Sequence, residues 1–118
     1  AHVTVSARRA SWGETRPSPA ARLAGAVAEM HDDRRFAVIQ IEDDGPGVPP
    51  EVLPHIFDPF FTTWGAGHGE GHGVGLGLFV VEEIVAEHGG CVAAETLSTG
   101  GARFTLWLPR RIQEEKHA

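Results

Sequence analysis

Alternating apolar and polar residues predict two strands in the first half of the chain. The first is Val3–Arg8, and the clearer one is Phe36–Asp43. In the second strand Ile39, Ile41 and Asp43 share one face, because successive side chains point to opposite sides of a sheet. A carboxylate beside two isoleucines is costly unless a polar group pairs with it, so Asp43 is a candidate binding residue.

The second half of the chain predicts a helix followed by a hairpin. Phe79–Glu87 contains no helix breaker, and Gly89-Gly90 ends it. The strands Cys91–Leu97 and Arg103–Leu108 flank a turn of Ser, Thr and Gly residues. Trp107 falls on the polar side of the last strand, and we expect that side to point outward.

The segment between the first two strands leaves two interpretations open. Residues 11–18 are polar and predict a connection. Ser18-Pro19 is a plausible helix start, since Leu23, Val27 and Met30 then follow at helical spacing. We favour a short surface insertion between two strands. After the second strand, a double proline precedes a predicted short helix at Glu51–His55.

Size and charge limit the classes of function. The 118 residues form one domain, and the net charge of −6 with no basic stripe argues against nucleic acid as a partner. Cys91 is the only cysteine, which excludes an internal disulfide, fits a cytosolic setting and predicts an inert buried thiol. No apolar stretch reaches the ~20 residues that cross a membrane, so we expect no membrane contact by this segment. We expect the segment in the cytoplasm, and a membrane anchor elsewhere in the full-length protein stays open.

A glycine-rich stretch leads directly into the predicted helix. Gly73, Gly75 and Gly77 alternate with apolar residues. Backbone without Cβ can approach a ligand closely, and a helix start offers unpaired N–H donors. Together these features predict a cradle for phosphate, although glycines before a helix can also form a simple tight turn.

Three sequence motifs in this order resemble a known family. They are DDGPG at 43–47, FDPFFTT at 57–63 and GVGLGL at 73–78. Their order and spacing resemble the ATP-binding catalytic domain of bacterial two-component sensor histidine kinases, within the gyrase, chaperone, histidine kinase and MutL ATPase superfamily. The resemblance covers about 36–109 of the single domain 1–118. It implies a two-layer α/β sandwich, with a mixed, mostly antiparallel sheet and helices on one face.

The resemblance also implies a nucleotide site. Asp43 would accept the exocyclic amine of adenine, and the glycine-rich stretch would close over the phosphates. The block FDPFFTT would anchor a mobile lid. No residue stands out as a catalytic base. The residues expected to contact the nucleotide are Ile41, Asp43, Gly45, Gly47, Val48, Phe61, Gly73, Gly75, Leu76 and Gly77.

The sequence departs from the family in ways that affect the cofactors, ATP and Mg²⁺. The family's magnesium ligand is an asparagine on a helix ahead of the first strand, and this chain contains no asparagine. We therefore expect a domain that is incomplete at its N-terminus, without that first helix. Residues 62–73 contain no Lys or Arg, and Trp64 replaces a frequent lysine. His68, Glu70 and His72 alternate among glycines that cannot hold them rigidly, so we predict no metal site.

The resemblance implies part of a histidine protein kinase. The whole protein would transfer phosphate from ATP to a histidine on a separate dimerisation domain, and then to a response regulator. We expect this chain alone to be inactive. The alternative is a degenerate, non-catalytic nucleotide-binding or interaction module of the same fold; a serine kinase for an anti-sigma partner disagrees with FDPFFTT. An uncovered apolar sheet face would favour a homodimer.

Overall fold

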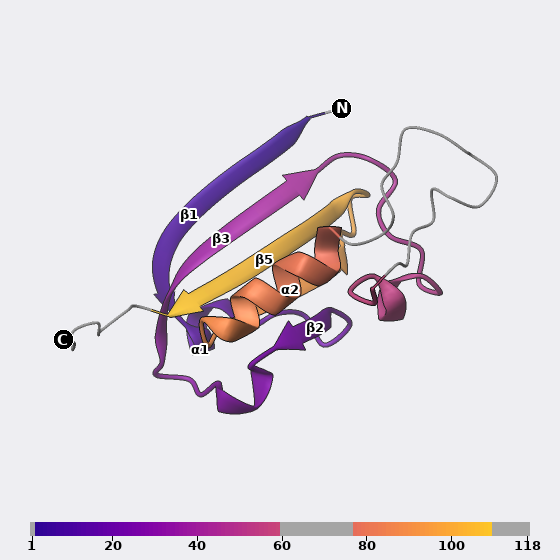
Figure 1. Cartoon of the computed structure of the whole chain (residues 1–118). Coiled ribbons are helices and arrows are strands. Elements are labelled where there is room, and N and C mark those ends of the chain that lie inside the picture. The colour runs from indigo at the N-terminus through magenta and orange to yellow at the C-terminus, as the bar shows by residue number, and fades with distance from the viewer. Residues whose placement is uncertain (1, 60–76, 110–118) are drawn as a thin grey trace.

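The computed structural model describes residues 2–59 and 77–109 and contains a five-stranded sheet with the order β1-β3-β5-β4-β2 (Figure 1). Each of the four strand pairings is antiparallel, which confirms the expected mostly antiparallel sheet. The strands are β1 (Val3–Ser11), β2 (Arg22–Gly25), β3 (Arg35–Asp43), β4 (Cys91–Thr96) and β5 (Ala102–Pro109). The helices are α1 (Trp12–Thr15) and α2 (Gly77–Glu87), with 3₁₀ turns η1 (Val27–Glu29) and η2 (Leu53–His55).

Helix α2 forms the second layer and packs over β2, β4 and β5 (Figure 1). The core beneath it buries Ile56, Phe57, Val92 and Ala94, and half-buried Leu78, Phe104 and Leu106 pack against them. The helix predicted at Phe79–Glu87, a stretch without helix breakers, is confirmed to within two residues. Among the described residues, no helix is long and apolar enough to cross a membrane.

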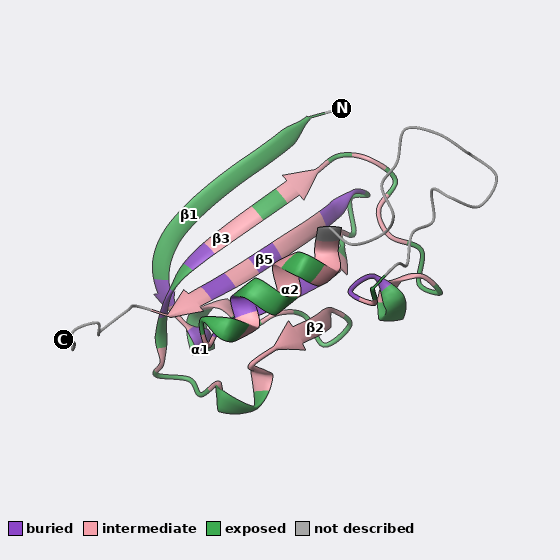
Figure 2. Cartoon of the chain, in the orientation of Figure 1, coloured by how far each residue is buried: buried purple, intermediate pink, exposed green. Residues whose placement is uncertain are grey.

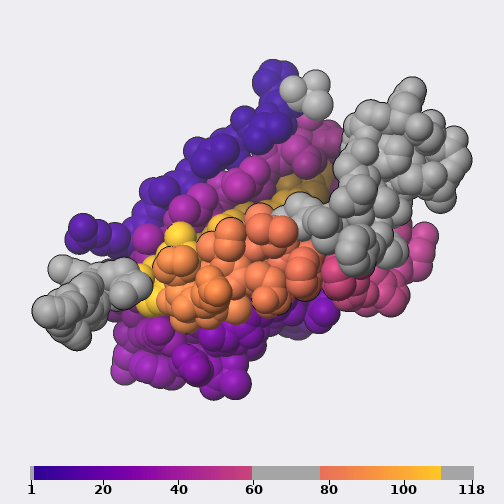
Figure 3. All heavy atoms as spheres, in the orientation of Figure 1, coloured from indigo at the N-terminus to yellow at the C-terminus, as the bar shows by residue number. Residues whose placement is uncertain are grey.

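On the same face of the sheet, no described helix covers β1 and β3 (Figures 2 and 3). Val3 and Val5 on β1 are 65% and 64% exposed, and Ile41 on β3 is 36% exposed. On α2, Val80 and Ile84 are 44% and 49% exposed. We call these five residues the open apolar face.

A second core lies on the opposite face and overturns the expectation for Trp107. The Trp107 side chain is fully buried, with its ring 4.9 Å from that of Trp12 in an edge-to-face arrangement. Its Nε1–H donates to Oγ1 of Thr15 at 2.8 Å. The prediction that Trp107 points outward was therefore wrong. Residues 11–18 were expected to be only a polar connection, but Trp12–Thr15 within them form α1, which places the ring of Trp12 on this face.

Residues 22–25 form a strand, so the helix that could have begun at Ser18-Pro19 is absent. Strand β2 pairs with the free edge of β4, where Arg22 lies opposite Ala94. Gly25 has φ +106, which a continuing helix cannot accommodate. The three apolar residues at helical spacing, Leu23, Val27 and Met30, still share a function, since all pack against the Trp107 core.

The predicted short helix after β3 is reduced to the 3₁₀ turn η2 (Leu53–His55). Backbone bonds from Val52 and Leu53 to the carbonyl of Pro49 close the preceding turn. Pro54 lies in the first turn of η2, a position at which the missing N–H of proline is tolerated.

Candidate functional site

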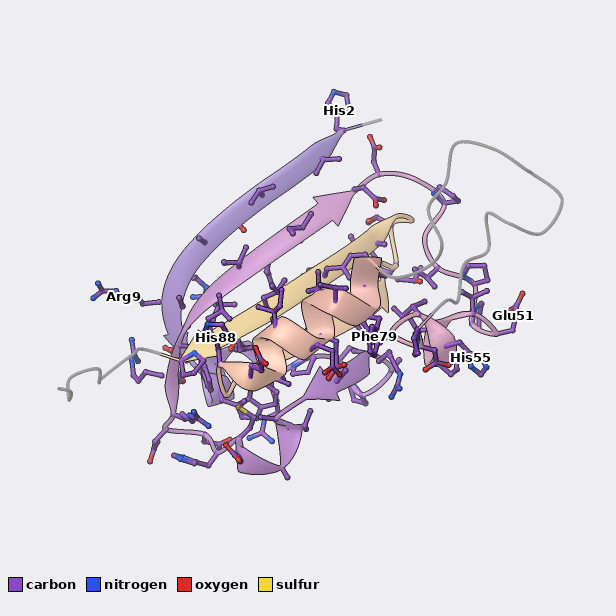
Figure 4. The ribbon with its side chains drawn as sticks, viewed as in Figure 1. His2, Arg9, Glu51, His55, Phe79 and His88 are labelled. Atoms are coloured by element: carbon purple, nitrogen blue, oxygen red, sulfur yellow. The ribbon has the colours of Figure 1, made fainter. Side chains whose placement is uncertain are left out.

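The described parts of the predicted motifs, 43–47, 57–59 and 77–78, lie toward one end of the sheet. Strand β3 ends there at Asp43, the turn between β4 and β5 lies beside it, and α2 begins at the same end (Figure 1). Figure 4 shows Phe79, in the first turn of α2, on the side of the helix toward the loop that carries Glu51 and His55. The segment from Asp44 to Val52 leaves the sheet at this point and connects β3 to η2.

Asp43 is half-buried, and its two carboxylate oxygens have different surroundings. Oδ1 accepts hydrogen bonds from the backbone N–H groups of Gly45 at 2.9 Å and Ala102 at 3.2 Å. Among the described residues, no donor bonds to Oδ2. The backbone therefore orients the carboxylate through one oxygen and leaves the other able to accept a hydrogen bond from a ligand.

The next carboxylate, Asp44, has a different role. Its Oδ1 accepts a hydrogen bond from the backbone N–H of His2 at 2.9 Å, and its Oδ2 lies 3.4 Å from Nδ1 of the same residue. Both side chains are exposed, and His2 lies at the free end of β1 (Figure 4). Asp44 thus tethers the start of β1, which makes Asp43 the carboxylate available to the site.

The two glycines of the motif serve different needs. Gly47 has φ +84, and a Cβ there would lie 2.7 Å from Cγ2 of Thr96. Its conformation and its packing against the hairpin both require glycine. A Cβ at Gly45 would meet only Oδ1 of Asp43, at 3.4 Å. The expectation that bare backbone faces a ligand therefore applies better to Gly45.

Two residues of the β4–β5 hairpin support this loop, and sequence analysis did not find them. A side chain at Gly101, where φ is +87, would overlap the carbonyl oxygen of Asp43. Thr96 Oγ1 donates to the carbonyl oxygen of Val48 at 2.8 Å and accepts from the N–H of Val48 at 3.0 Å. The glycine pair predicted a turn, but no pattern indicated which loop that turn contacts.

The structure brings five of the predicted site residues together: Ile41, Asp43, Gly45, Gly47 and Val48. Ile41 lies two residues before Asp43 on the same face of β3, so it offers an apolar surface next to the carboxylate. Gly77 is the first residue of α2. Phe61, Gly73, Gly75 and Leu76 lie outside the described residues.

A cavity of about 490 Å³ adjoins the loop on its other side, between residues 18–22 and residues 48–54. Val48 and Thr96 line it, and Asp43 does not. Its lining is mainly apolar side chains.

The titratable groups with shifted pKa values lie away from Asp43. Cys91, at the opposite end of β4 and in the Trp107 core, is fully buried, as expected for an inert thiol, and burial raises its pKa to about 12. On α2, burial and a hydrogen bond with Glu83 raise the pKa of Glu82. In the part of the chain that the structure describes, no group of three or more His, Cys, Asp or Glu side chains is placed to hold a metal ion.

Comparison with known proteins identifies related sequences. Residues 17–112 match the family described as histidine kinase-, DNA gyrase B-, and HSP90-like ATPase. The sensor histidine kinase CpxA of Escherichia coli K12 is 46% identical over 77 residues, which are 65% of this chain and 17% of that protein. The signal transduction histidine-protein kinase AfsQ2 of Streptomyces coelicolor is 47% identical over 73 residues, 62% of this chain and 14% of that protein.

The fold is also similar to a solved structure, the mycobacterial sensor histidine kinase MprB. The match has a TM-score of 0.53 and 31% sequence identity, and it covers 64% of this chain and 49% of that one. The likeness supports the sandwich of one helical layer on an antiparallel sheet. This chain spans less than a fifth of the length of CpxA and AfsQ2.

Proposed function

Because the chain belongs to the family of histidine kinase-, DNA gyrase B- and HSP90-like ATPases, we propose that it is the ATP-binding part of a sensor histidine kinase. The observation that carries this proposal is the Asp43 carboxylate. One oxygen is held by two backbone N–H groups, and the other has no donor among the described residues. An adenine ring needs such an acceptor for its amine beside an apolar surface.

In this proposal the adenine lies against Ile41 and Gly45, and its amine donates to Oδ2 of Asp43. Gly47 and Val48 shape the loop beside it. The phosphates extend toward the start of α2, where the first N–H groups of a helix have no partner within the helix. Gly73, Gly75, Leu76 and Gly77 would contact the phosphates there, and Phe61 would lie near the nucleotide.

Magnesium enters this proposal only as a partner of the ATP phosphates, whose charge it would neutralise. The described residues offer no cluster of carboxylates or histidines for it, and the sequence contains no asparagine. The residues that the structure describes therefore do not fit a magnesium site, and we assign no step to the ion. Asp43 is directed to the base, so we expect nucleotide binding to respond little to Mg²⁺.

The whole protein, in this proposal, moves the γ-phosphoryl group of ATP to a histidine on a dimerisation domain and then to an aspartate of a response regulator. Those two domains are the proposed partners, and the proposed location of this part is the cytoplasm. Phosphoryl transfer depends on positioning and electrostatic stabilisation, and this chain contributes the positioning of the nucleotide.

One observation favours the alternative, a non-catalytic module of the same fold. Residues 62–73 contain no Lys or Arg, so this segment offers the phosphates no fixed positive charge. An outward Trp107 would also have favoured such a module, because it could contact a partner, but that side chain is buried.

Calorimetric titration with ADP, with and without Mg²⁺, tests the proposal. In Asp43→Asn the remaining side-chain oxygen can still accept the backbone hydrogen bonds. The NH₂ group of the new side chain then faces the adenine amine, and two donors cannot form a hydrogen bond with each other. We expect it to weaken ADP binding by about tenfold or more. Asp44→Asn is the matched control and should bind as the unaltered chain does. Equal ADP affinity of the unaltered chain and Asp43→Asn would refute the role of Asp43, and strong dependence on Mg²⁺ would refute our account of the metal.

A further inference from the structure

Thr96 holds the loop of the proposed adenine site although it is far from that loop in sequence. Its hydroxyl donates to the carbonyl oxygen of Val48 at 2.8 Å and accepts from the N–H of the same residue at 3.0 Å. One side chain therefore satisfies both backbone groups of Val48, as a neighbouring strand would. Thr96 itself is the last residue of β4 and is exposed.

The other end of the loop is held by the same hairpin. The N–H of Ala102 donates to Oδ1 of Asp43 at 3.2 Å, and Gly101 packs against the carbonyl group of Asp43. Between these two contacts, the N–H of Leu97 donates to the carbonyl oxygen of Gly101 at 2.9 Å and closes the turn. The β4–β5 hairpin thus fixes the distance between the two ends of the loop, Asp43 and Val48.

Hydrogen bonds of an exposed side chain contribute little to global stability, because water replaces them at small cost when they are lost. Two such bonds to one residue nevertheless define where that residue lies. The methyl group Cγ2 of Thr96 adds a steric limit, since it occupies the space beside Gly47. The arrangement is suited to positioning rather than to stabilisation.

We propose that Thr96 is a positioning residue for nucleotide binding, which sets the loop from Asp43 to Val48 so that Oδ2 of Asp43 meets the adenine amine. This inference rests on the proposed function. When a ligand is recognised through a single hydrogen-bond acceptor, a small displacement of that acceptor weakens binding strongly. Loss of the two bonds between Thr96 and Val48 therefore weakens recognition of the base more than it weakens the fold.

The test compares Thr96→Val, which keeps the shape but removes the hydroxyl, with Thr96→Ser, which keeps the hydroxyl. Calorimetry measures the affinity of the 118-residue chain for ADP and for inosine diphosphate, which carries an oxygen in place of the amine. We expect Thr96→Val to bind ADP about tenfold more weakly and to lose preference for ADP over inosine diphosphate. Thr96→Ser should retain both, and the unfolding midpoints should differ by only a few degrees.

The possible failures are distinguishable. If the unaltered chain binds ADP and Thr96→Val binds it with the same affinity and the same preference, Thr96 has no positioning role, while the proposed function stands. If the unaltered chain binds no nucleotide, both proposals fall. Should Thr96→Val not fold, hydrogen exchange at the Val48 amide in Thr96→Ser decides. Exchange as slow as in the unaltered chain supports the positioning of Val48 by the hydroxyl at position 96, and fast exchange overturns it.

Discussion

At the scale of single residues, Gly100 and Gly101 form a matched pair. Both have positive φ, +92 and +87, but a Cβ at Gly100 has open space around it, whereas one at Gly101 would overlap the Asp43 carbonyl. Gly100→Ala should cost about 1 kcal/mol from backbone strain alone. We expect Gly101→Ala to cost about 2 kcal/mol more, since Asp43 must move. Urea unfolding of both variants measures the difference, and equal losses would contradict the close packing.

Cys91 predicts a dependence of stability on pH. Burial raises the pKa of its thiol to about 12, above the value near 8.5 expected in the unfolded chain. The folded state therefore retains the proton longer, and stability that is complete below about pH 8.5 declines as the pH rises toward 12. Cys91→Ala removes this contribution. The slope of the unfolding free energy between pH 8.5 and 10 should be shallower in that variant, and identical slopes would refute the assignment.

The residues of the candidate site could be predicted only where the neighbouring sequence indicates their role. Asp43 was predicted because it is a carboxylate on an apolar strand face and because the glycines that follow it form a motif. Thr96 acts on Val48 across 48 positions of sequence, so no periodicity or spacing indicates the contact. The reason for glycine at position 47 is likewise a tertiary contact, with the same threonine.

At the scale of elements, the local sequence found α2, which contains no helix breaker, and the strands β1, β3, β4 and β5. The segment 12–30 was harder to predict. Trp12 lies in a short polar stretch, and nothing local shows that it packs on Trp107. Residues 22–25 became a strand since β4 offered an unpaired edge, which is a property of the assembled sheet and not of the segment.

Helix α1 has only four residues and depends on its cap. The Ser11 hydroxyl accepts from the N–H of Glu14 at 3.1 Å, and the Glu14 carboxylate accepts from the N–H of Ser11 at 2.8 Å. Ser11→Ala should cost about 1 kcal/mol of unfolding free energy. Ser6→Ala, on an exposed part of β1, is the control and should change stability by no more than about 0.5 kcal/mol.

The same cap lowers the pKa of Glu14, chiefly through the hydrogen bond from the Ser11 backbone. Because the pKa of Glu14 is lower in the folded chain than in the unfolded chain, ionised Glu14 stabilises the fold at pH values above the unfolded pKa. This stabilisation is lost as the pH falls through the folded pKa. The difference in stability between the unaltered chain and Glu14→Gln, which removes the charge, should therefore narrow in acid. A constant difference down to pH 3 would show that the capping box does not depend on the charge of Glu14.

At the scale of the whole molecule, the open apolar face predicts self-association. Val3, Val5 and Ile41 lie on the sheet beside the uncovered edge of β1, which pairs only with β3 in the described structure. An edge strand presents unpaired N–H and C=O groups, and a second copy joined along β1 would satisfy them and bring the apolar side chains of the two β1 strands next to each other. The helix that could have covered such a face from residues 18–30 is absent, because that segment forms β2 and η1.

Light scattering over a range of concentrations measures this association. We expect the mass of the unaltered chain to rise from one copy toward two, and Val5→Ser to shift the rise to higher concentration, because it removes apolar area that only a partner covers. Thr4→Ala leaves the apolar face unchanged, since Thr4 points to the opposite side of β1. It should associate as the unaltered chain does. A mass of one chain at every concentration would exclude the dimer, and an equal effect of both substitutions would place the contact elsewhere on β1.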